Sequence, residues 1–278
     1  MISKLILSTL EKDNDLPPRQ RVSHYPSSAS FKYSDGTLIG PDLLNQYLGW
    51  KGVPPSNLSD GTGLFKMRLG DGTHTEIAKI LSRAGVKAIS EVGGKVNIPG
   101  LLYPISYRVD GVLEFDSKTI ILEVKSSTYN QIFSDWGVIN KGPKEDHLLQ
   151  VICYLEFVPG ADHAVILYVD RADGGMVEFK VSKNKNRYYL NGKMLPELSF
   201  TGIVDRWKEL ETYLKDNKTP DPEYRAWLSD DKLRVMPAKT IKGKKYKTDW
   251  RVSYSPYKDY IYLNPDNYKF TFNAEHDK

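Results

Sequence analysis

The segment HAVILYVD, residues 163–170, restricts the fold more than any other part of the chain. It is a continuous apolar run and lacks the alternation of a strand with one face in water. A strand of this kind is buried on both faces, so the sheet that contains it must be covered on both sides. The run therefore predicts an α/β fold, in which a mixed central sheet is flanked by helices.

The pattern around this run alternates between strands and helices. Further strands are expected at residues 88–92, 94–98, 105–115, 119–126 and 176–182, and helices at 41–48, 145–157 and 202–216. Another helix is expected to begin at Thr73, because Glu76 completes a capping box three residues later, and to end at Gly85. These elements supply both the sheet and the helices that cover it.

The distribution of residue types predicts three units. Residues 1–60 are rich in Pro, Ser and Gly and are expected to form an irregular lobe that packs on the core. Residues 61–220 hold the regular elements, and residues 221–278 form a basic, aromatic C-terminal segment. With 278 residues, the chain is long enough for one large domain with such appendages.

Composition excludes several classes of protein. The net charge of +4 does not by itself indicate a nucleic-acid partner. The single cysteine, Cys153, excludes an intrachain disulfide and a site built from several thiolates. The N-terminus lacks a signal-peptide pattern and the chain has no long apolar run. We therefore expect a cytoplasmic protein, in the host cytoplasm if a virus encodes it, with no membrane partner.

Two charges interrupt the apolar strand TIILEVKSS at residues 119–127. Glu123 and Lys125 are two residues apart, so their side chains share one face of the strand. The preceding strand ends at DSK, which is typical of a tight turn. With Ser117 and Lys118 as the turn residues, Asp110 lies opposite Lys125 and shares its face.

This set of side chains suits metal-assisted phosphodiester hydrolysis. Two carboxylates supply hard oxygen ligands for Mg²⁺ or Mn²⁺. The metal lowers the pKa of its bound water, and a nearby amine stabilises charge that develops on the phosphate. The alternative is an ordinary cross-strand ion pair on a face in contact with solvent.

Three motifs in order resemble those of a known nuclease superfamily. Asp110-x12-Glu123-x-Lys125, set in strand, turn and strand, resembles the signature of the PD-(D/E)XK superfamily. Gln150-x3-Tyr154, on the following helix, resembles the extra motif of the RecB-like branch. Gly70-x3-His74 resembles the first motif of that branch. The resemblance covers about residues 60–170, and Tyr107 replaces the Gly that the branch often carries three residues before the Asp.

The resemblance implies a restriction-endonuclease-like fold and a Mg²⁺- or Mn²⁺-dependent deoxyribonuclease. It implies an exonuclease that acts on single-stranded DNA ends or on the ends of duplex DNA, in recombination, repair or phage DNA processing. The implied metal ligands are His74, Asp110, Glu123 and the Val124 carbonyl, the catalytic amine is Lys125, and Gln150 and Tyr154 position DNA or Lys125. Glu91, on the strand before, is a candidate extra acid near the metals.

Each assignment has an alternative. His74 alone is typical of a helix surface, Glu91 of an exposed strand position, and Gln150 with Tyr154 of a hydrogen-bonded helical pair. A structure-specific flap or junction endonuclease, a catalytically idle DNA-binding subunit and a structural partner in a larger complex are the competing functions. An oligomer, or a helicase or recombinase partner, is compatible with each of them.

The C-terminal stretch TDWRVSYSPYKDY resembles a segment of iron–sulfur members of this branch, among them CRISPR-associated RecB-like exonucleases. Val252, Ser255 and Ile261 stand at the positions of three of their cysteines, so we expect no iron–sulfur cluster. Aromatic packing is expected to hold this lobe instead, with base stacking as the alternative role of its tyrosines, which are Tyr246, Tyr254, Tyr257, Tyr260 and Tyr262.

Residues 232–251 carry a cluster of basic side chains. A run of this kind is typical of a solvated loop, and it also suits contact with a phosphate backbone. The candidate nucleic-acid-binding residues are Lys242, Lys244, Lys245, Lys247 and Arg251.

Overall fold

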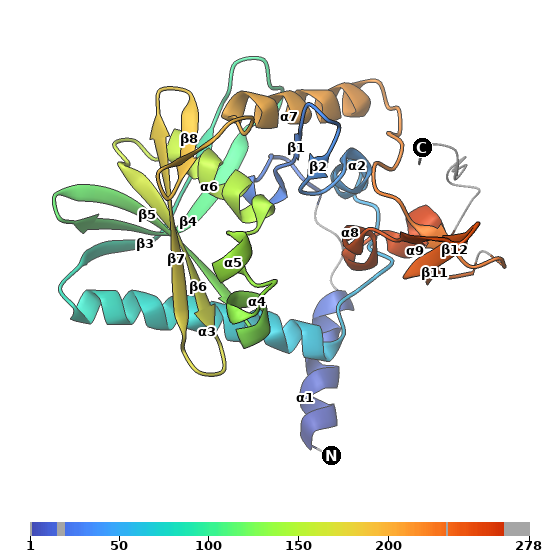
Figure 1. Ribbon diagram of the computed structural model, residues 1–278, viewed down its shortest axis with the longest axis horizontal. Helices are drawn as coiled ribbons and strands as arrows, with labels where there is room; N and C mark the ends of the chain where they lie inside the picture. The colour runs from blue at the N-terminus through green and yellow to red at the C-terminus, as the bar shows by residue number, and fades with distance from the viewer. Residues whose placement is uncertain (1, 16–19, 232, 264–278) are drawn as a thin grey trace.

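A computed structural model describes residues 2–15, 20–231 and 233–263 and contains one large mixed sheet (Figure 1). Its strands, in spatial order, are β3 (Lys87–Val96), β4 (Ile105–Phe115), β5 (Lys118–Ser127), β6 (His163–Asp170), β7 (Met176–Asn184), β8 (Arg187–Leu190) and β9 (Lys193–Leu195). Strands β5 and β6 run parallel, and the other neighbouring pairs are antiparallel.

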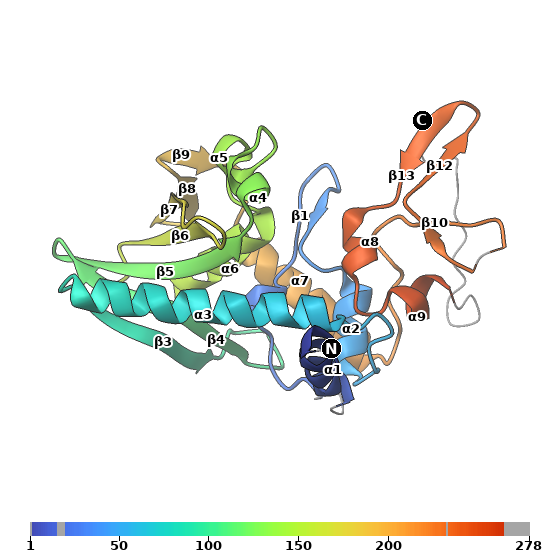
Figure 2. The same cartoon turned by 90° about the horizontal axis from the view of Figure 1, so that it is seen from below.

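Helices cover both faces of this sheet (Figures 1 and 2). Helices α6 (Glu145–Phe157) and α7 (Phe200–Lys215) pack on one face, and α3 (Gly61–Arg83) crosses the other. The side chains of β6 divide between the two cores: Ile166 and Tyr168 pack with α6, whereas Val169 packs with Ile77 of α3. The expected α/β fold, with a mixed sheet flanked by helices, is therefore confirmed.

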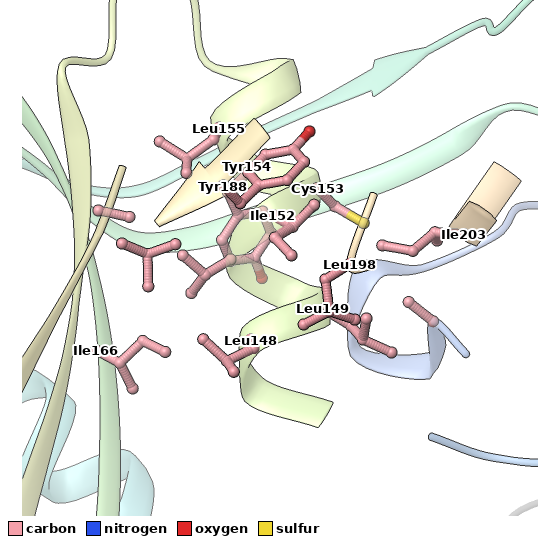
Figure 3. Close-up of a cluster of buried hydrophobic side chains, with 14 of the residues drawn as sticks. Leu148, Leu149, Ile152, Cys153, Tyr154, Leu155, Ile166, Tyr188, Leu198 and Ile203 are labelled. Atoms are coloured by element: carbon pink, nitrogen blue, oxygen red, sulfur yellow. The ribbon is translucent and has the colours of Figure 1, made fainter. Parts of the chain in front are cut away.

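The core beneath α6 fixes the position of that helix. Figure 3 shows Leu148, Leu149 and Ile152 of α6 pointing toward side chains of the sheet and of α7, among them Ile166 and Ile203. Each such side chain contributes roughly 1.5–3 kcal/mol when it is fully buried. Since α6 also carries two candidate site residues, this packing positions them against the sheet.

Helix α3 begins earlier than the sequence pattern predicts. Its N-cap is Asp60, whose Oδ1 accepts a hydrogen bond from the Gly63 N–H at 2.7 Å. Thr73 is no cap, because its hydroxyl donates to the Leu69 carbonyl within the same helix. The predicted start at Thr73 is therefore wrong, and the capping-box pattern lies inside a 23-residue helix.

In the part of the chain that the structure describes, no helix is both long and apolar enough to cross a bilayer.

The hairpin between β4 and β5 turns one residue earlier than expected. Asp116 and Ser117 have φ values of 51° and 56°, which is the left-handed pair of a type I′ turn. Phe115 consequently pairs with Lys118. The predicted turn at Ser117 and Lys118 is wrong, because Asp116 and Ser117 are the residues that take the two positive φ values of the type I′ turn, which matches the twist of the strands.

The N- and C-terminal parts of the chain build one second core together. Helices α2 (Leu43–Trp50), α8 (Trp250–Tyr254) and α9 (Lys258–Tyr262) pack there with Leu210 of α7. Parts of the first and third predicted units therefore share this core, whereas Phe31 and Ile39 of the first unit pack in the main core beneath α6. Lys232 and residues 264–278 of the predicted C-terminal unit lie outside the described residues.

Short elements complete the chain. They are α1 (Ile2–Glu11), η1 (Lys12–Asp15), η2 (Pro26–Ser28), β1 (Phe31–Lys32), β2 (Leu38–Ile39), α4 (Tyr129–Phe133), α5 (Val138–Lys141), β10 (Trp227–Leu228), β11 (Val235–Met236), β12 (Ala238–Ile241) and β13 (Lys244–Lys247). Strands β12 and β13 form a separate antiparallel hairpin. The C-terminal segment is thus more regular than its sequence indicates.

Packed side chains fill the three C-terminal positions that the expected resemblance aligns with cysteines. Val252 and Ile261 are each 1% exposed and belong to the second core. The Ser255 hydroxyl donates to the Asn45 side chain of α2. Of the tyrosines, Tyr257 and Tyr262 are buried there and Tyr260 packs against them, whereas Tyr254 is largely exposed and Tyr246 is half-buried in the β12–β13 hairpin. Aromatic packing therefore holds this lobe, as expected, but not through every tyrosine.

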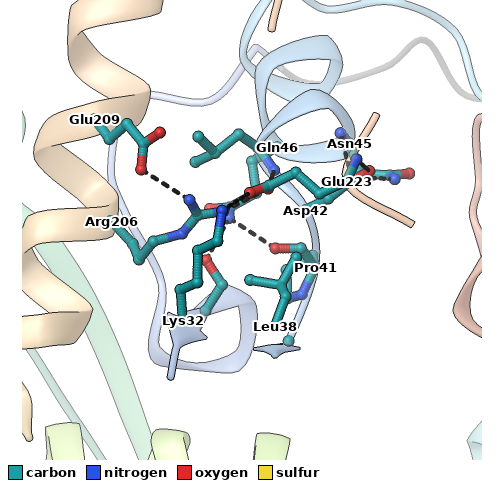
Figure 4. Close-up of polar contacts among 12 residues, drawn as sticks. Lys32, Leu38, Pro41, Asp42, Asn45, Gln46, Arg206, Glu209 and Glu223 are labelled. Atoms are coloured by element: carbon teal, nitrogen blue, oxygen red, sulfur yellow. Dashed lines mark hydrogen bonds and ion pairs between the residues drawn. The ribbon is translucent and has the colours of Figure 1, made fainter. Parts of the chain in front are cut away.

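A buried ionic contact ties α7 to the lobe (Figure 4). The Arg206 guanidinium donates to Glu209 at 2.8 Å and to Glu223, which follows α7 in the chain. Nearby, Asp42 caps α2 by accepting a hydrogen bond from the Asn45 N–H at 2.8 Å, and burial raises its pKa. The Leu43 N–H of α2 donates to the same Glu223 carboxylate at 3.0 Å, so Glu223 links α2 to α7.

Glu211 of α7 holds the segment before β4 in place. Its carboxylate accepts hydrogen bonds from His24 Nε2 at 2.8 Å, from the Leu102 N–H at 2.8 Å and from the Tyr103 N–H at 3.0 Å. The His24 ring stacks on Trp207 at 5.3 Å between ring centroids. Burial lowers the pKa of His24, and the nearby Glu211 carboxylate only partly opposes this effect. The lowered pKa favours a neutral imidazole as the donor.

We expect Glu211→Ala to lower the free energy of unfolding by about 3–5 kcal/mol, because it leaves the buried His24 and two partly buried backbone N–H groups without their acceptor. Urea denaturation at neutral pH measures this loss. Thr212→Ala, at the exposed neighbouring position, is the control and should change the value by less than about 0.5 kcal/mol. Equal losses in the two variants would contradict this role of Glu211.

Candidate active site

Strands β4 and β5 separate where the two carboxylates lie. Their ladder ends at the pair Gly111–Leu122, and in the same register Asp110 and Glu123 are the next opposing residues. The Val124 N–H does not continue the ladder but donates to Asp110 Oδ2 at 2.8 Å. A side chain thus replaces a backbone partner, and both carboxylates lie at the point where the strands part.

The ladder on the other side of β4 is interrupted at the same level. The pairs Ser90–Gly111 and Val92–Val109 flank Glu91 and Asp110, which do not pair with each other although the ladder continues on both sides of them. Glu91 has a φ of 54°, a left-handed conformation that is rare outside glycine and short polar residues. Asp110 is therefore free of regular pairing on both sides, and its side chain can reach groups on β5 and α3.

The predicted arrangement of the three charges needs one correction. Asp110 lies opposite Glu123 and not opposite Lys125, because the hairpin turn is at Asp116 and Ser117. Glu123 and Lys125 do share a face, with Glu123 Oε1 and Lys125 Nζ 2.5 Å apart. Asp110 lies between the strands and contacts both β5 and α3.

His74 approaches Asp110 from α3. Its Nδ1 is 3.3 Å from Asp110 Oδ1, and this hydrogen bond raises the pKa of His74. A close approach of α3 to β5 makes the contact possible, since a Cβ at Gly70 would lie only 3.0 Å from Ser126 Oγ. Gly70 and His74 therefore act together, although they lie within α3 and not at its start.

Glu123 is a buried carboxylate with one unsatisfied oxygen. The residue is 2% exposed, and its Oε2 has no hydrogen-bond partner among the described residues. Burial raises its pKa to about 7, while the charge of Lys125 opposes this rise and the charge of Asp110 adds to it. An unpaired buried carboxylate oxygen is costly, so its position calls for a cation or a proton.

A chain of hydrogen bonds orients Lys125. Its Nζ donates to Gln150 Oε1 at 3.0 Å, and Gln150 Nε2 donates to the Tyr154 hydroxyl at 2.7 Å. The Tyr154 hydroxyl donates in turn to the Arg108 carbonyl of β4 at 2.8 Å. The two helix residues therefore lie beside the amine, as the motif predicts, and connect it to the strand that carries Asp110.

A cleft of about 1030 Å³ opens beside Asp110, between α3 and the strands β3 and β4. His74, Glu91 and Arg108 contribute to its walls. Arg108, which the sequence analysis does not single out, is exposed, and its guanidinium has no hydrogen bond or ion pair within the described ranges. Its spacing of two residues from Asp110 is the signal that could have identified it.

A second pair that the sequence analysis misses lies behind Lys125. His147 Nδ1 is 2.7 Å from the Tyr168 hydroxyl, which also accepts the Lys144 N–H at 3.0 Å. Tyr168 is the β6 partner of Lys125 in the sheet. Burial lowers the pKa of His147 to about 2, and the charges of Lys125 and Lys144 add to this effect. His147 precedes Gln150 by three residues, so helical spacing could have placed it near the site.

The predicted nucleic-acid-binding residues fall into two groups. Lys242, Lys244, Lys245 and Lys247 are exposed on the β12–β13 hairpin. Arg251 instead forms an ion pair with Asp249 at 2.7 Å and donates to the Leu38 carbonyl at 2.7 Å. Its guanidinium also lies 4.0 Å from the centre of the Tyr224 ring. The donors of Arg251 therefore help to hold the lobe together, and its role in binding nucleic acid stays a prediction.

The residues present fit a hard divalent cation. Within the described residues, no three His, Cys, Asp or Glu side chains are already grouped as a metal site. The unpaired Glu123 Oε2 nevertheless lies in a cluster with Asp110, and carboxylate oxygens are the ligands that Mg²⁺ and Mn²⁺ prefer. The Val124 carbonyl stays a predicted ligand. Glu91 lines the wall of the cleft and stays a candidate extra acid.

Comparisons with known proteins do not assign a family. No protein-family model and no curated protein matches the chain. One solved structure, titled "Crystal structure of SSO0001", is similar with a TM-score of 0.45 and 17% identity, over 76% of this chain and 86% of that chain. Similarity at this level carries no argument about fold family or function.

We expect the buried His147 to make stability depend on pH. Between pH 7 and pH 5 the unfolded chain takes up a proton at this residue, whereas the folded chain does not, so stability falls as the pH falls. His147→Asn removes this contribution. Urea denaturation should show that the parent loses about 2 kcal/mol more than the variant over this range. His24 and His163 are common to both proteins, so parallel pH dependences would contradict the assignment.

Proposed function

We propose that the chain is a Mg²⁺- or Mn²⁺-dependent deoxyribonuclease of the RecB-like PD-(D/E)XK type, with a restriction-endonuclease-like fold. One observation carries the proposal: Lys125 Nζ is held between Glu123 and Gln150, and the free oxygen of Glu123 lies in a cluster with Asp110. This combination of a fixed amine and two carboxylates suits phosphodiester hydrolysis and is unusual for a purely structural ion pair.

Asp110 and Glu123 would hold the cation, with the Val124 carbonyl and His74 as further ligands. When bound, the cation would lower the pKa of a coordinated water and offset charge on the phosphate. Asp110 is already oriented for this role, because the Val124 N–H fixes its second oxygen. Positive charge near Glu123 would also favour the ionised form of a carboxyl whose pKa burial has raised to about 7.

Lys125 is the catalytic amine in this proposal. Its ammonium group would orient the attacking water and stabilise charge on a non-bridging phosphate oxygen. Gln150 and Tyr154 fix its position through the chain of hydrogen bonds to β4, so the amine need not reorganise during the reaction. Side-chain order of this kind is what a catalytic group requires.

The surroundings of the site support a nucleic-acid substrate. The cleft beside Asp110 offers the guanidinium of Arg108, which pairs with none of the described residues and suits contact with a phosphate. The lysines of the β12–β13 hairpin suit contacts with the backbone that do not depend on sequence. We propose an exonuclease on single-stranded ends, working in recombination, repair or phage DNA processing, with an oligomer or a helicase or recombinase as partner.

We expect Lys125→Ala to lower cleavage at least about 100-fold without loss of fold, because it removes the amine and leaves both carboxylates. End-labelled linear single-stranded DNA with Mg²⁺ measures the rate, and circular dichroism checks the fold. Lys118→Ala, at the exposed start of the same strand, is the matched control and should cleave at the parent rate. Cleavage by purified Lys125→Ala at the parent rate would show that the proposed mechanism is wrong.

Substrate topology separates exonuclease from endonuclease. We expect the protein to degrade linear single-stranded DNA, to leave circular single strands intact, and to lose activity in EDTA. Gel analysis of both substrates, with Mg²⁺ or Mn²⁺ added back, provides the measurement. Cutting of circular strands at a similar rate would instead support a structure-specific endonuclease, and DNA binding without cleavage would support an idle subunit.

A further inference from the structure

A second, smaller pocket lies where β5 and β6 end. It has a volume of about 340 Å³ and is lined by residues of the two strand ends and the loops that follow them, among them Ser127, Tyr129, Asn130, Asp170 and Arg171. Ser127 and Asp170 are direct neighbours in the parallel pairing of the two strands. The carboxyl ends of adjacent parallel strands are a common place for ligands to bind.

Asp170 is a buried acceptor that lacks a donor. It is 2% exposed, and its Oδ1 accepts a hydrogen bond from the Ala172 N–H at 2.9 Å. Its Oδ2 is buried and has no partner among the described residues. Leaving such an oxygen unpaired is costly, so this wall of the pocket suits a ligand that brings a hydrogen-bond donor.

The neighbouring arginine does not satisfy this carboxylate. Arg171 uses its Nε to donate to the Ser127 carbonyl at 3.3 Å and its NH1 to donate to the Lys66 carbonyl of α3 at 3.2 Å. These two donations point away from Asp170, so among the described residues no side chain donates to its Oδ2. A phosphate group is disfavoured beside it, whereas a neutral group with N–H donors is favoured.

Tyr129 supplies an aromatic surface at the same pocket. Tyr129 is 56% exposed, and the centroid of its ring lies 5.2 Å from that of the Phe133 ring. Exposed aromatic rings supported in this way are the platforms on which nucleic-acid bases stack. An aromatic face next to a buried acceptor matches a nucleobase that carries an amino group.

The pocket is close to the proposed catalytic amine. Ser127 follows Lys125 by two residues on β5, a separation of about 7 Å along the strand. A strand whose phosphate lies at Lys125 could therefore place the base of an adjacent nucleotide in the pocket.

We propose that this pocket binds one base of the DNA strand next to the scissile phosphate, with Tyr129 stacking on the base and Asp170 accepting a hydrogen bond from its exocyclic amino group. The inference rests on the proposed nuclease function. Cytosine carries such an amino group and thymine does not, so the pocket gives the enzyme a preference for cytosine over thymine at this position.

Asp170→Asn provides the sharpest test. The amide oxygen keeps the hydrogen bond to the Ala172 N–H, while the amide nitrogen turns the free acceptor into a donor. Fluorescence anisotropy in EDTA, which needs no cleavage, measures the affinity for labelled oligo-dC and oligo-dT of equal length. We expect the parent to bind oligo-dC about tenfold more tightly, and the variant to lose or reverse this preference.

Two further variants separate stacking from general loss of binding. Tyr129→Ala should weaken binding of both oligonucleotides about tenfold. Phe115→Ala removes an exposed ring at the end of β4, beside Lys118 at the start of β5 and far along the strand from the pocket, and should leave both affinities unchanged. An equal ratio of oligo-dC to oligo-dT affinity in the parent and in folded Asp170→Asn would overturn the proposal.

The two proposals can fail separately. Suppose that the parent cleaves DNA, that Lys125→Ala does not, and that Asp170→Asn keeps the parent's ratio of oligo-dC to oligo-dT affinity. This result would support the nuclease and reject the base pocket. Suppose instead that the parent cleaves no DNA but prefers oligo-dC, and that Asp170→Asn reverses this preference. This result would support the base pocket and reject the nuclease. Absence of binding to either oligonucleotide would reject the pocket as a site for DNA bases.

Discussion

The site depends on one hydrogen bond, from the Val124 N–H of β5 to the Asp110 carboxylate of β4. It lies where the β4–β5 ladder ends and compensates for a backbone bond that the separated strands no longer form. The pairing of β4 with β3 is interrupted at the same residue, beside the left-handed backbone of Glu91. Two interruptions of regular pairing thus free Asp110 to meet Glu123 and His74 in the interior of a large sheet.

Burial then makes this arrangement costly unless a charge balances it. Glu123 and Lys125 are close enough to form an ion pair, but Glu123 keeps a free oxygen and its pKa is raised to about 7. A sheet selected only for stability would favour apolar side chains at such positions. We propose that a bound cation offsets this cost, and the packing of α6 keeps Lys125 in place through Gln150.

Sequence patterns predict the elements with strong apolar periodicity, such as α6 and β6, because packing and local preference agree there. They fail where backbone geometry decides. Asp116, Ser117 and Glu91 all take a left-handed backbone conformation, and none of them is a glycine that would mark it. The sequence therefore does not predict that Asp110 lies opposite Glu123. The motifs still bring His74, Gln150 and Tyr154 to the site, whereas Arg108, His147 and Asp170 follow no motif and require the three-dimensional arrangement.

Binding of Mn²⁺ to the purified protein, followed by electron paramagnetic resonance, reports on the cation site without requiring a substrate. We expect the parent to bind Mn²⁺ and Glu123→Gln, which keeps the shape of the side chain but removes its charge, to bind at least about tenfold more weakly. Lys118→Ala, at an exposed position of the same strand, should bind as the parent does. Equal Mn²⁺ affinity in the parent and in folded Glu123→Gln would contradict the account.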